Sequence, residues 1–308
     1  MDIAAPDRPA GTHPAEDLAP GLRPDSAFAP AIPLGDAAEP LVVYPDYATH
    51  MALPMVHRDR PPMHFDLPAA WRYFQKFRED KEQTRYVFNI FDSLPWSDVD
   101  QYAQRFLATE KGARIYATEP FLPDVLDDHD ALRRLPAGSL AHAYCDFIES
   151  HAMSAKGLVA EYDLHREGRP RINDRVEWYI DRLRDTHDLL HVLNGFDTDT
   201  LGEQCVLTFV CHQRHSIGHA FLGFAGTAVM LKEVRTRAPV FRAAWEAWRN
   251  GKVARPIHEE AIRELLPMPL DDVRRTLNIR PAHYYQKAQH IWREEEGVDP
   301  HMVLARAA

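Results

Sequence analysis

Apolar residues recur at helical spacing along most of the chain from residue 67 onward. The repeat of three or four residues runs through Trp71, Phe74 and Phe77, and then through Val87, Ile90, Phe91 and Leu94. Apolar side chains at this spacing share one face of a helix. No stretch alternates with a period of two for long enough to predict a strand. The pattern therefore predicts an all-α fold.

Two helices in the middle of the chain have the clearest boundaries. An amphipathic helix is expected over Val176–Val192, and Gly195 sits where a glycine commonly ends a helix. A second helix is expected to begin near Thr200 and to extend to about Arg235. Elsewhere, Ser139 predicts the start of a capped helix, Asn250-Gly251 predicts a turn, and residues 271–277 predict a short helix.

The first 66 residues differ from the rest of the chain. Residues 1–40 hold eight of the 24 prolines and show almost no apolar periodicity. Such a segment buries too little surface to offset its ordering entropy, so we expect a disordered leader followed by a semi-ordered linker over 41–66. The predicted organisation is a leader and linker over 1–66, one helical domain over 67–295, and a tail over 296–308.

Composition narrows the classes of function. A net charge of −10 argues against nucleic acid as a partner, because a phosphate backbone rewards a clustered positive surface. Three scattered cysteines form no CxxC pair, which excludes a thiolate zinc knuckle. The first forty residues lack a secretory signal, and the apolar run 217–231 is shorter than the roughly 20 residues that span a bilayer. We therefore expect an intracellular protein that does not cross a membrane.

Two histidines share the apolar face of the helix at 176–192. With Val176 as origin and about 100° per residue, His187 falls at about 20° and His191 at about 60°, while Asp188 lies near 120° at the edge of the stripe. Histidines at i and i+4 stack one turn apart, which is the spacing that a single metal ion bridges. The pair with its adjacent carboxylate therefore predicts a metal site.

Glu203 reaches this site only if the chain turns back. Twelve residues of continuous helix would place it roughly 18 Å from His191 along the axis, but the break at Asn194-Gly195 allows the next helix to return alongside. Two imidazoles and up to two carboxylates suit zinc, iron or manganese rather than calcium, with zinc favoured.

Each of these residues also has a structural interpretation. Paired histidines on an apolar stripe can be hydrogen-bonded core residues. Thr200 with Glu203 matches a capping box, in which the glutamate reaches back to the helix N-terminus. Asp188 can orient a histidine without touching metal.

The spacing His-Asp-x-x-His, eleven residues, Glu resembles the signature of the Coq4 family of ubiquinone biosynthesis proteins. It falls on His187, Asp188, His191 and Glu203 in this sequence. Flanking blocks are similar too: Arg105 to Thr109, Leu135 to Leu140, Ala143-Tyr144, Gln213, and Pro269 to Arg274. The resemblance covers roughly residues 67–295.

The resemblance implies a function, a ligand set and partners. His187, Asp188, His191 and Glu203 become both the metal ligands and the catalytic residues. The implied reaction is metal-dependent C1 decarboxylation, with hydroxylation at that carbon, of a polyprenylated 4-hydroxybenzoate-type intermediate. A protein of this family is expected to be a homodimer that binds an isoprenoid lipid and other quinone-biosynthesis enzymes. It is expected in the cytoplasm, peripheral on the inner face of the membrane.

Two stretches from His212 onward each have two possible interpretations. His212, His215 and His219 would share one helix face, either as an amphipathic surface or as added acid–base groups, and here the sequence departs from the family pattern. The run 217–231 contains Gly218, Gly223 and Gly226, which make room for a neighbouring helix or for a prenyl chain.

Two other functions remain open from the sequence. Adjacent His-Asp on a helix also occurs in HD-type phosphohydrolases, although these normally add an upstream His and a downstream Asp. A non-catalytic lipid- or quinone-binding scaffold with a purely structural metal is the alternative outside enzymes. An HExxH metalloprotease is disfavoured, because Asp188 stands in place of the glutamate.

Overall fold

The chain folds into helices and short helical turns. The computed structural model describes residues 47–80, 83, 85–166, 171–214 and 216–304. Within these ranges the only β pairing is an isolated bridge between Ser139 and Pro269. The all-α prediction is confirmed.

The helices in chain order have the following bounds: α1 Tyr47–Ala52, α2 Leu67–Glu79, α3 Arg85–Ser93, α4 Val99–Leu107, α5 Glu110–Thr118, α6 Leu122–Leu126, α7 His129–Arg133, α8 Leu140–Ser150, α9 Ala155–Arg166, α10 Arg175–Asp185, α11 His187–Asn194, α12 Thr200–Cys211, α13 Ile217–Glu233, α14 Val240–Val253, α15 Ile262–Leu265, α16 Leu270–Thr276 and α17 His283–His290. Short turns follow at η2 Ile257–Glu259, η3 Ile291–Glu295 and η4 Pro300–Met302.

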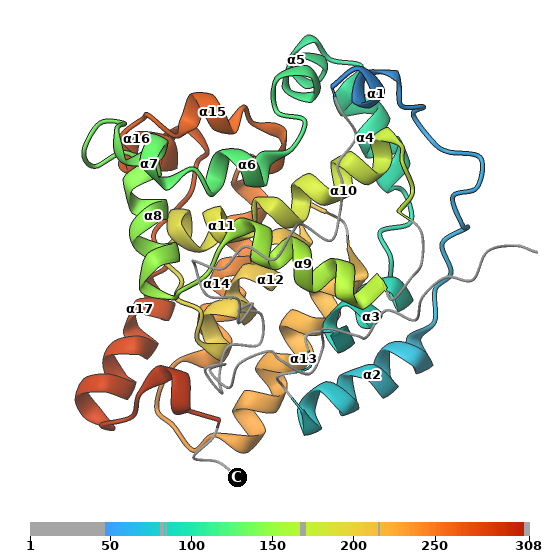
Figure 1. Cartoon of the computed structure of the whole chain (residues 1–308). Coiled ribbons are helices and arrows are strands. Elements are labelled where there is room, and N and C mark those ends of the chain that lie inside the picture. Colours follow the sequence, from blue (N-terminus) through green and yellow to red (C-terminus); the bar gives the residue numbers. More distant parts are fainter. Residues whose placement is uncertain (1–46, 81–82, 84, 167–170, 215, 305–308) are drawn as a thin grey trace, which may run out of the picture.

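Helix α12 is the centre of the fold. All twelve of its residues are buried, and it packs between α14 and α13 in the middle of the view in Figure 1. A Cβ on Gly251 of α14 would lie 1.8 Å from the carbonyl oxygen of Phe209, and one on Gly223 of α13 would lie 2.6 Å from Thr208. Glycine at both positions therefore lets the two neighbours approach α12 closely.

This close packing tests two predictions that were based on glycine residues. Asn250-Gly251 lies inside α14, so the predicted turn is wrong, and Gly251 serves helix contact instead. Gly223 and Gly226 of α13 face Thr208 and Gln204 of α12. The neighbour that needs the space at these two positions is therefore a helix.

The predicted helix over 176–192 is divided into two. Helix α10 ends at Asp185 and α11 begins at His187, with Thr186 between them. The carbonyl oxygen of Leu183 accepts a hydrogen bond of 2.8 Å from Arg214 Nη2. A side chain from a distant segment thus occupies a carbonyl that a continuous helix would offer to the amide of His187.

The predicted helix from Thr200 to about Arg235 is also divided. Helix α12 ends at Cys211, and α13 starts at Ile217 after the N-cap residue Ser216. His212 therefore belongs to the end of one helix and His219 to the start of the next. The shared face predicted for the three histidines is wrong, and His215 lies outside the described residues.

Other local predictions are confirmed. Ser139 caps α8 by accepting a hydrogen bond from the amide of His142. Gly195 ends α11 with a φ of 69° in the left-handed region, which glycine adopts without strain. The short helix predicted at 271–277 is α16.

The described part of the predicted linker is attached to the helical body. His50 of α1 is buried, and its Nε2 lies 2.9 Å from the carbonyl oxygen of Tyr116. Arg60 Nε donates to Asp174 Oδ2 over 2.8 Å. Residues 1–46 lie outside the described residues, so the disordered leader and the domain boundaries stay predictions.

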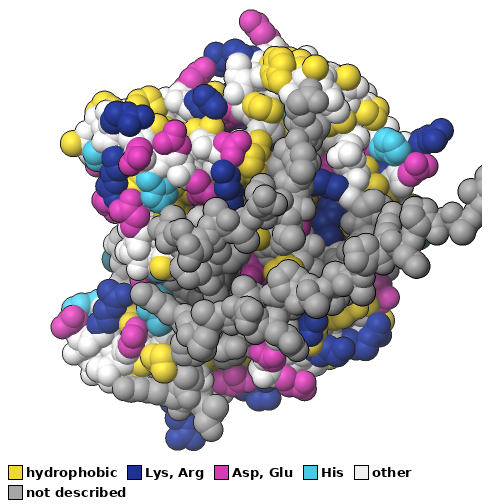
Figure 2. Space-filling view, viewed as in Figure 1, with side chains coloured by type: hydrophobic (Ala, Val, Ile, Leu, Met, Phe, Trp, Pro, Cys, Tyr) yellow, Lys and Arg dark blue, Asp and Glu magenta, His cyan; other side chains and the backbone are white. Residues whose placement is uncertain are grey.

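The surface and the helix lengths bear on possible partners. Positive and negative side chains are interspersed on the face shown in Figure 2. No helix among the described residues is long and apolar enough to cross a membrane.

Candidate metal centre

Helices α11 and α12 bring His187, His191 and Glu203 together. The Nε2 atoms of the two histidines are 3.2 Å apart. Glu203 Oε2 lies 3.5 Å from His187 Nε2, and Oε1 lies 3.5 Å from His191 Nε2. One ligand atom from each residue falls within 4.8 Å of the other two. Three of the four ligands predicted from sequence thus meet at one point.

The turn between the two helices fixes the position of Glu203. Asp199 caps α12, and its Oδ1 accepts hydrogen bonds from the amides of Leu201 and Gly202. Its other oxygen accepts a hydrogen bond from the hydroxyl of Tyr285. The alternative capping box of Thr200 and Glu203 is therefore wrong, because Asp199 caps the helix and leaves the Glu203 carboxylate facing the histidines. Asp199 is a preferred N-cap residue type, so this was readable from sequence.

The charges of Glu203 and of the two histidines affect one another's protonation. Burial alone would raise the pKa of Glu203, but the nearby His191 and His187 outweigh it and bring the pKa to about 2. Burial lowers the pKa of His191, but the Glu203 carboxylate more than offsets this and holds the pKa above its ordinary value. Glu203 is therefore an anion across the physiological pH range. Its side chain is buried, with only 1% of the residue surface exposed.

The spacing fits a tetrahedral metal ion. Ligand atoms bound at about 2.0–2.1 Å to a tetrahedral ion lie about 3.3–3.4 Å apart. The two histidine nitrogens are 3.2 Å apart, and each lies 3.5 Å from a different oxygen of the Glu203 carboxylate. Charge-assisted hydrogen bonds are shorter, at about 2.7–2.9 Å. Glu203 Oε2 has no hydrogen-bond partner among the described residues, so the carboxylate is positioned better for an ion than for the imidazoles.

Neighbouring groups orient His191. Its Nδ1 lies 3.3 Å from the carbonyl oxygen of Phe196. A proton on Nδ1 would be donated to that oxygen, which leaves the Nε2 lone pair directed at Glu203 and His187. Metal-binding histidines commonly use a backbone carbonyl in this way. Phe147 of α8 stacks on the ring, with centroids 5.5 Å apart; no sequence pattern had marked this residue.

Asp188 does not belong to the group of three in this arrangement. Burial raises the pKa of its carboxyl above the ordinary value, whereas His187 and His191 pull that pKa down. Burial raises the pKa of the Tyr144 hydroxyl, and the charge of Asp188 adds to that rise. The carboxyl thus lies near the histidines, and its role as a fourth ligand stays a prediction.

Buried Arg214 and half-buried His219 form a pair near the same helix. Arg214 Nη1 lies 3.1 Å from His219 Nε2, and His219 Nδ1 lies 2.8 Å from Ser216 Oγ. Burial, Arg214 and His187 together lower the pKa of His219 well below its ordinary value. His219 is therefore neutral and hydrogen-bonded at both nitrogens. His212 instead packs on Trp248, with ring centroids 4.4 Å apart.

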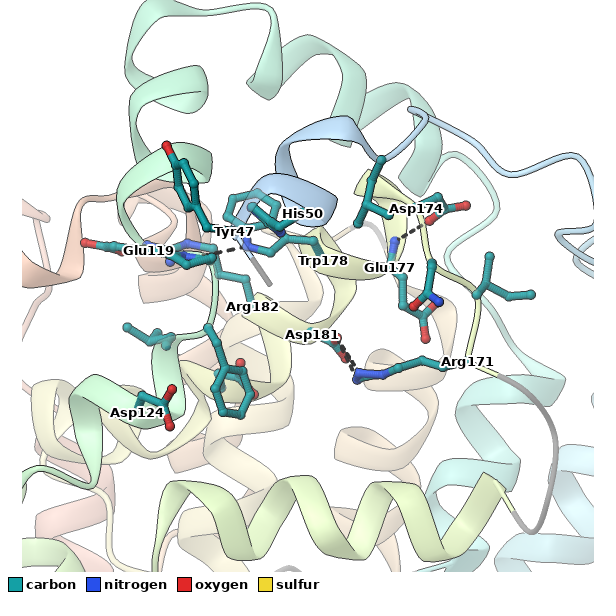
Figure 3. Close-up of a pocket in the computed structure, with 17 residues that line it drawn as sticks. Tyr47, His50, Glu119, Asp124, Arg171, Asp174, Glu177, Trp178, Asp181 and Arg182 are labelled. Carbon is teal, nitrogen blue, oxygen red and sulfur yellow. Dashed lines mark hydrogen bonds and ion pairs between the residues drawn. The ribbon is translucent and has the colours of Figure 1, made fainter. Parts of the chain in front are cut away.

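A separate pocket of about 260 Å³ lies beside α10, and it includes none of the four predicted ligands. Figure 3 shows its wall of charged side chains. Its acids are paired: Glu119 with Arg182, and Asp181 with Arg171. The remaining acids pair as Asp124 with Lys156, Asp174 and Glu177 with Arg60, and Asp185 with Arg184. These ion pairs account for the charged side chains of the pocket as structural contacts.

Comparison with known proteins matches most of the described chain to one family. The family model described as coenzyme Q (ubiquinone) biosynthesis protein Coq4 matches residues 93–283. A mitochondrial ubiquinone biosynthesis protein COQ4 homolog of Drosophila ananassae is 27% identical over 172 residues, 56% of this chain and 62% of the relative. The Danio rerio homolog is 28% identical over 169 residues, 55% of this chain and 59% of the relative.

A third relative and one solved structure complete the comparison. The mitochondrial COQ4 homolog 2 of Culex quinquefasciatus is 31% identical over 108 residues, 35% of this chain and 45% of the relative. The chain thus spans less than two thirds of the length of these curated relatives. A crystal structure of a ubiquinone biosynthesis protein from Nostoc punctiforme aligns with a TM-score of 0.46 at 18% identity, covering 70% of this chain and 99% of that one.

Proposed function

This chain belongs to the Coq4 family of coenzyme Q (ubiquinone) biosynthesis proteins, and we propose that it is a metal-dependent decarboxylase of that pathway. The substrate would be a polyprenylated 4-hydroxybenzoate-type intermediate that loses its C1 carboxyl. The observation that carries the proposal is the convergence of His187, His191 and Glu203, with one ligand atom of each within 4.8 Å of the other two. Asp188 stays the predicted fourth ligand.

His187, His191 and Glu203 would hold the metal and leave one side of it open to substrate. A bound zinc, iron or manganese ion supplies Lewis acidity that stabilises the negative charge developing as a carboxyl leaves an aromatic ring. Glu203 and His191 are almost fully buried, whereas the side chain of His187 is 18% exposed. Substrate would therefore approach from the His187 side.

The two forms of the reaction place different demands on the site. Loss of the carboxyl as carbon dioxide leaves an electron pair on the ring carbon, which must then take up one proton. If Asp188 is not a metal ligand, it is a candidate for holding that proton, because burial raises the pKa of its carboxyl. Replacement of the carboxyl by a hydroxyl consumes dioxygen and water and releases carbon dioxide and hydrogen peroxide. This form calls for a redox-active metal such as iron or manganese, or for a substrate that itself gives up electrons, because zinc has no redox chemistry of its own.

The proposal extends to partners and location. We propose a homodimer, peripheral on the inner face of the membrane, that takes an isoprenoid lipid and works with other quinone-biosynthesis enzymes. Exposed apolar side chains support membrane contact: Ile217 and Leu231 of α13 are 52% and 50% exposed, and Phe241 and Trp245 of α14 are 50% and 43% exposed. An apolar polyprenyl tail would partition to such a surface.

The two alternative functions fit the site less well. An HD-type phosphohydrolase would add a further histidine and aspartate, whereas the group among the described residues is completed by Glu203. A scaffold with a structural metal would close the site with four protein ligands. A site of His187, His191 and Glu203 alone would leave one tetrahedral position open, which favours catalysis, whereas closure by Asp188 as a fourth ligand would favour the scaffold.

The first test is metal content by mass spectrometry on purified wild-type, His187→Ala and Glu203→Gln proteins. We expect stoichiometric metal in the wild type and its loss in both variants. Glu233→Gln, a carboxylate of α13 outside the group, is the matched control and should keep the metal. Wild-type protein that stays metal-free after reconstitution would refute the metalloenzyme and leave the lipid-binding scaffold.

A turnover assay then separates decarboxylase from scaffold. The metal-loaded wild type should release carbon dioxide from a prenylated 4-hydroxybenzoate, and the His187→Ala variant should not. Full metal loading without turnover, with partner binding kept in His187→Ala, would favour the scaffold. Release of phosphate from a generic phosphate ester would favour the phosphohydrolase.

A further inference from the structure

A second set of metal-binding side chains meets between α7 and α8. His129 is the first residue of α7, and Cys145 and Glu149 lie one turn apart on α8. One ligand atom from each residue lies within 4.8 Å of the other two. We propose that His129, Cys145 and Glu149 form a second site, for a thiophilic divalent metal of the zinc class. The proposal does not depend on the decarboxylase activity.

The distance between His129 and Glu149 resembles the distance between two ligands of one metal ion. His129 Nδ1 lies 3.2 Å from Glu149 Oε1, close to the roughly 3.3 Å that separates two nitrogen or oxygen ligands of a tetrahedral zinc. Residues at i and i+4 project from one face of a helix. Cys145 and Glu149 therefore present their side chains to the same point, with His129 facing them from α7.

Arg133 binds one oxygen of the Glu149 carboxylate and leaves the other available to a metal ion. Its Nη2 donates to Glu149 Oε2 over 2.6 Å, and its Nη1 donates to Asp146 Oδ1 over 2.6 Å. The carboxylate is thereby held with Oε1 directed at His129. Asp146 offsets the positive charge of Arg133 beside the site. Asp127 is close enough to His129 to interact with it electrostatically.

The thiol supplies the selectivity of the site. Cys145 is completely buried, and burial raises the pKa of its thiol to about 11. Metal binding would therefore form one sulfur–metal bond and release the thiol proton to solvent. Sulfur, nitrogen and oxygen ligands together favour zinc over magnesium or calcium, which take oxygen ligands. His129 and Glu149, with side chains 16% and 43% exposed, leave the outer side of the site open to solvent.

The second site is one helix away from the first. Helix α8 carries Cys145 and Glu149 towards α7, and it carries Phe147 against the ring of His191. A metal between α7 and α8 would fix the helix that braces His191. Without a metal, the same residues are an ion pair and a core thiol, and the experiment separates these two states.

Cobalt is the probe, because only the second site offers a thiolate. Co²⁺ bound by a thiolate gives a sulfur-to-metal charge-transfer band in the near ultraviolet, whereas a site of two histidines and a glutamate gives none. Metal-free full-length protein would be titrated with Co²⁺ as wild type, Cys145→Ala, His129→Gln and His187→Ala. Cys211→Ala removes another buried thiol that donates to Thr208 and is the matched control.

We expect one thiolate-bound cobalt per wild-type chain. The band should vanish in Cys145→Ala, persist in Cys211→Ala and His187→Ala, and need more than about tenfold higher Co²⁺ in His129→Gln, since even loss of an outer partner costs 10–100-fold. Circular dichroism would confirm that each variant is folded. A folded wild type with no band at saturating Co²⁺, or an unchanged titration of His129→Gln, would overturn the site. Neither result bears on His187, so the proposed function is tested separately.

Discussion

The ring of Phe147 stacks on the imidazole of His191, with centroids 5.5 Å apart and an angle of 22° between the planes. The contact comes from α8, a helix that supplies none of the four ligands predicted for this centre. Together with the carbonyl oxygen of Phe196, 3.3 Å from Nδ1, it fixes both the plane and the tautomer of the histidine. The candidate metal centre is therefore positioned in part by residues outside its predicted ligands.

Removing this contact should weaken metal binding while keeping the ligands. We expect Phe147→Ala to reduce metal affinity by about 10–100-fold, the range seen when outer partners of a ligand are lost. Competition with a chelator of known affinity would measure the change. Phe147→Leu restores apolar volume without a flat ring and should fall between the two. Unchanged affinity in Phe147→Ala would show that the stack does not position His191.

The roles of Thr200 and Glu203 can be separated by substitution. Thr200→Ala should leave metal content and stability nearly unchanged, because Asp199 supplies the cap. Asp199→Ala should lower the free energy of unfolding by about 1–2 kcal/mol through loss of the cap. Glu203→Gln should abolish metal binding. Chemical denaturation and metal analysis on the three proteins provide the measurements, and a Thr200→Ala protein destabilised as much as Asp199→Ala would contradict the assignment of the cap.

The C-terminal turn η4 should respond to pH through His301. Its Nε2 lies 3.3 Å from Asp197 Oδ2, and this carboxylate raises the pKa of His301 above the ordinary value. Burial opposes but does not reverse a strong lowering of the Asp197 pKa by His151 and His301. A raised histidine pKa gives stability that is full below about pH 6.5 and is lost as pH rises through the folded value.

We therefore expect amide protection around residues 300–304 to decrease as the pH is raised above neutral. After correction for the intrinsic exchange rate, hydrogen exchange read by mass spectrometry would detect it. In His301→Gln the pH dependence should disappear. A segment that becomes better protected at high pH would contradict the ion pair.

Close packing on α12 predicts a difference between two glycines. A Cβ at Gly251 would lie 1.8 Å from a backbone oxygen of Phe209, whereas one at Gly226 would meet the end of the Gln204 side chain at 2.4 Å. A side chain can move aside and a buried helix backbone cannot. Gly251→Ala should cost about 1–3 kcal/mol or more, as overpacking does, and Gly226→Ala clearly less. Equal losses in thermal or denaturant unfolding would contradict this packing.

Local signals in the sequence were enough to predict the centre of the site. The i, i+4 spacing of His187 and His191, together with the turn at Gly195, predicts that the next helix returns and carries Glu203 to the histidines. These features depend only on helix geometry and on the conformational freedom of one glycine. The all-α class follows for the same reason, since the apolar period is a local property.

The errors came from contacts between distant segments. The helix break at Thr186 coincides with a bond from Arg214 to the carbonyl of Leu183, 31 residues away. Gly251 was interpreted as a turn residue because the approach of α14 to α12 leaves no local mark. The sequence predicts one shared face for His212, His215 and His219 because the break between α12 and α13 depends on how the two helices pack. Phe147 likewise carried no signal for its contact with His191.

The burial of α12 also has a kinetic consequence. The segment that bears Glu203 is buried along its whole length, so it belongs to the part of the fold that opens only in the rarest fluctuations. His187 sits on the shorter α11 and keeps some contact with solvent. Metal exchange should therefore begin with release of His187 while Glu203 stays in place, and the lifetime of the bound ion would follow the motion of α11 rather than the stability of the whole protein.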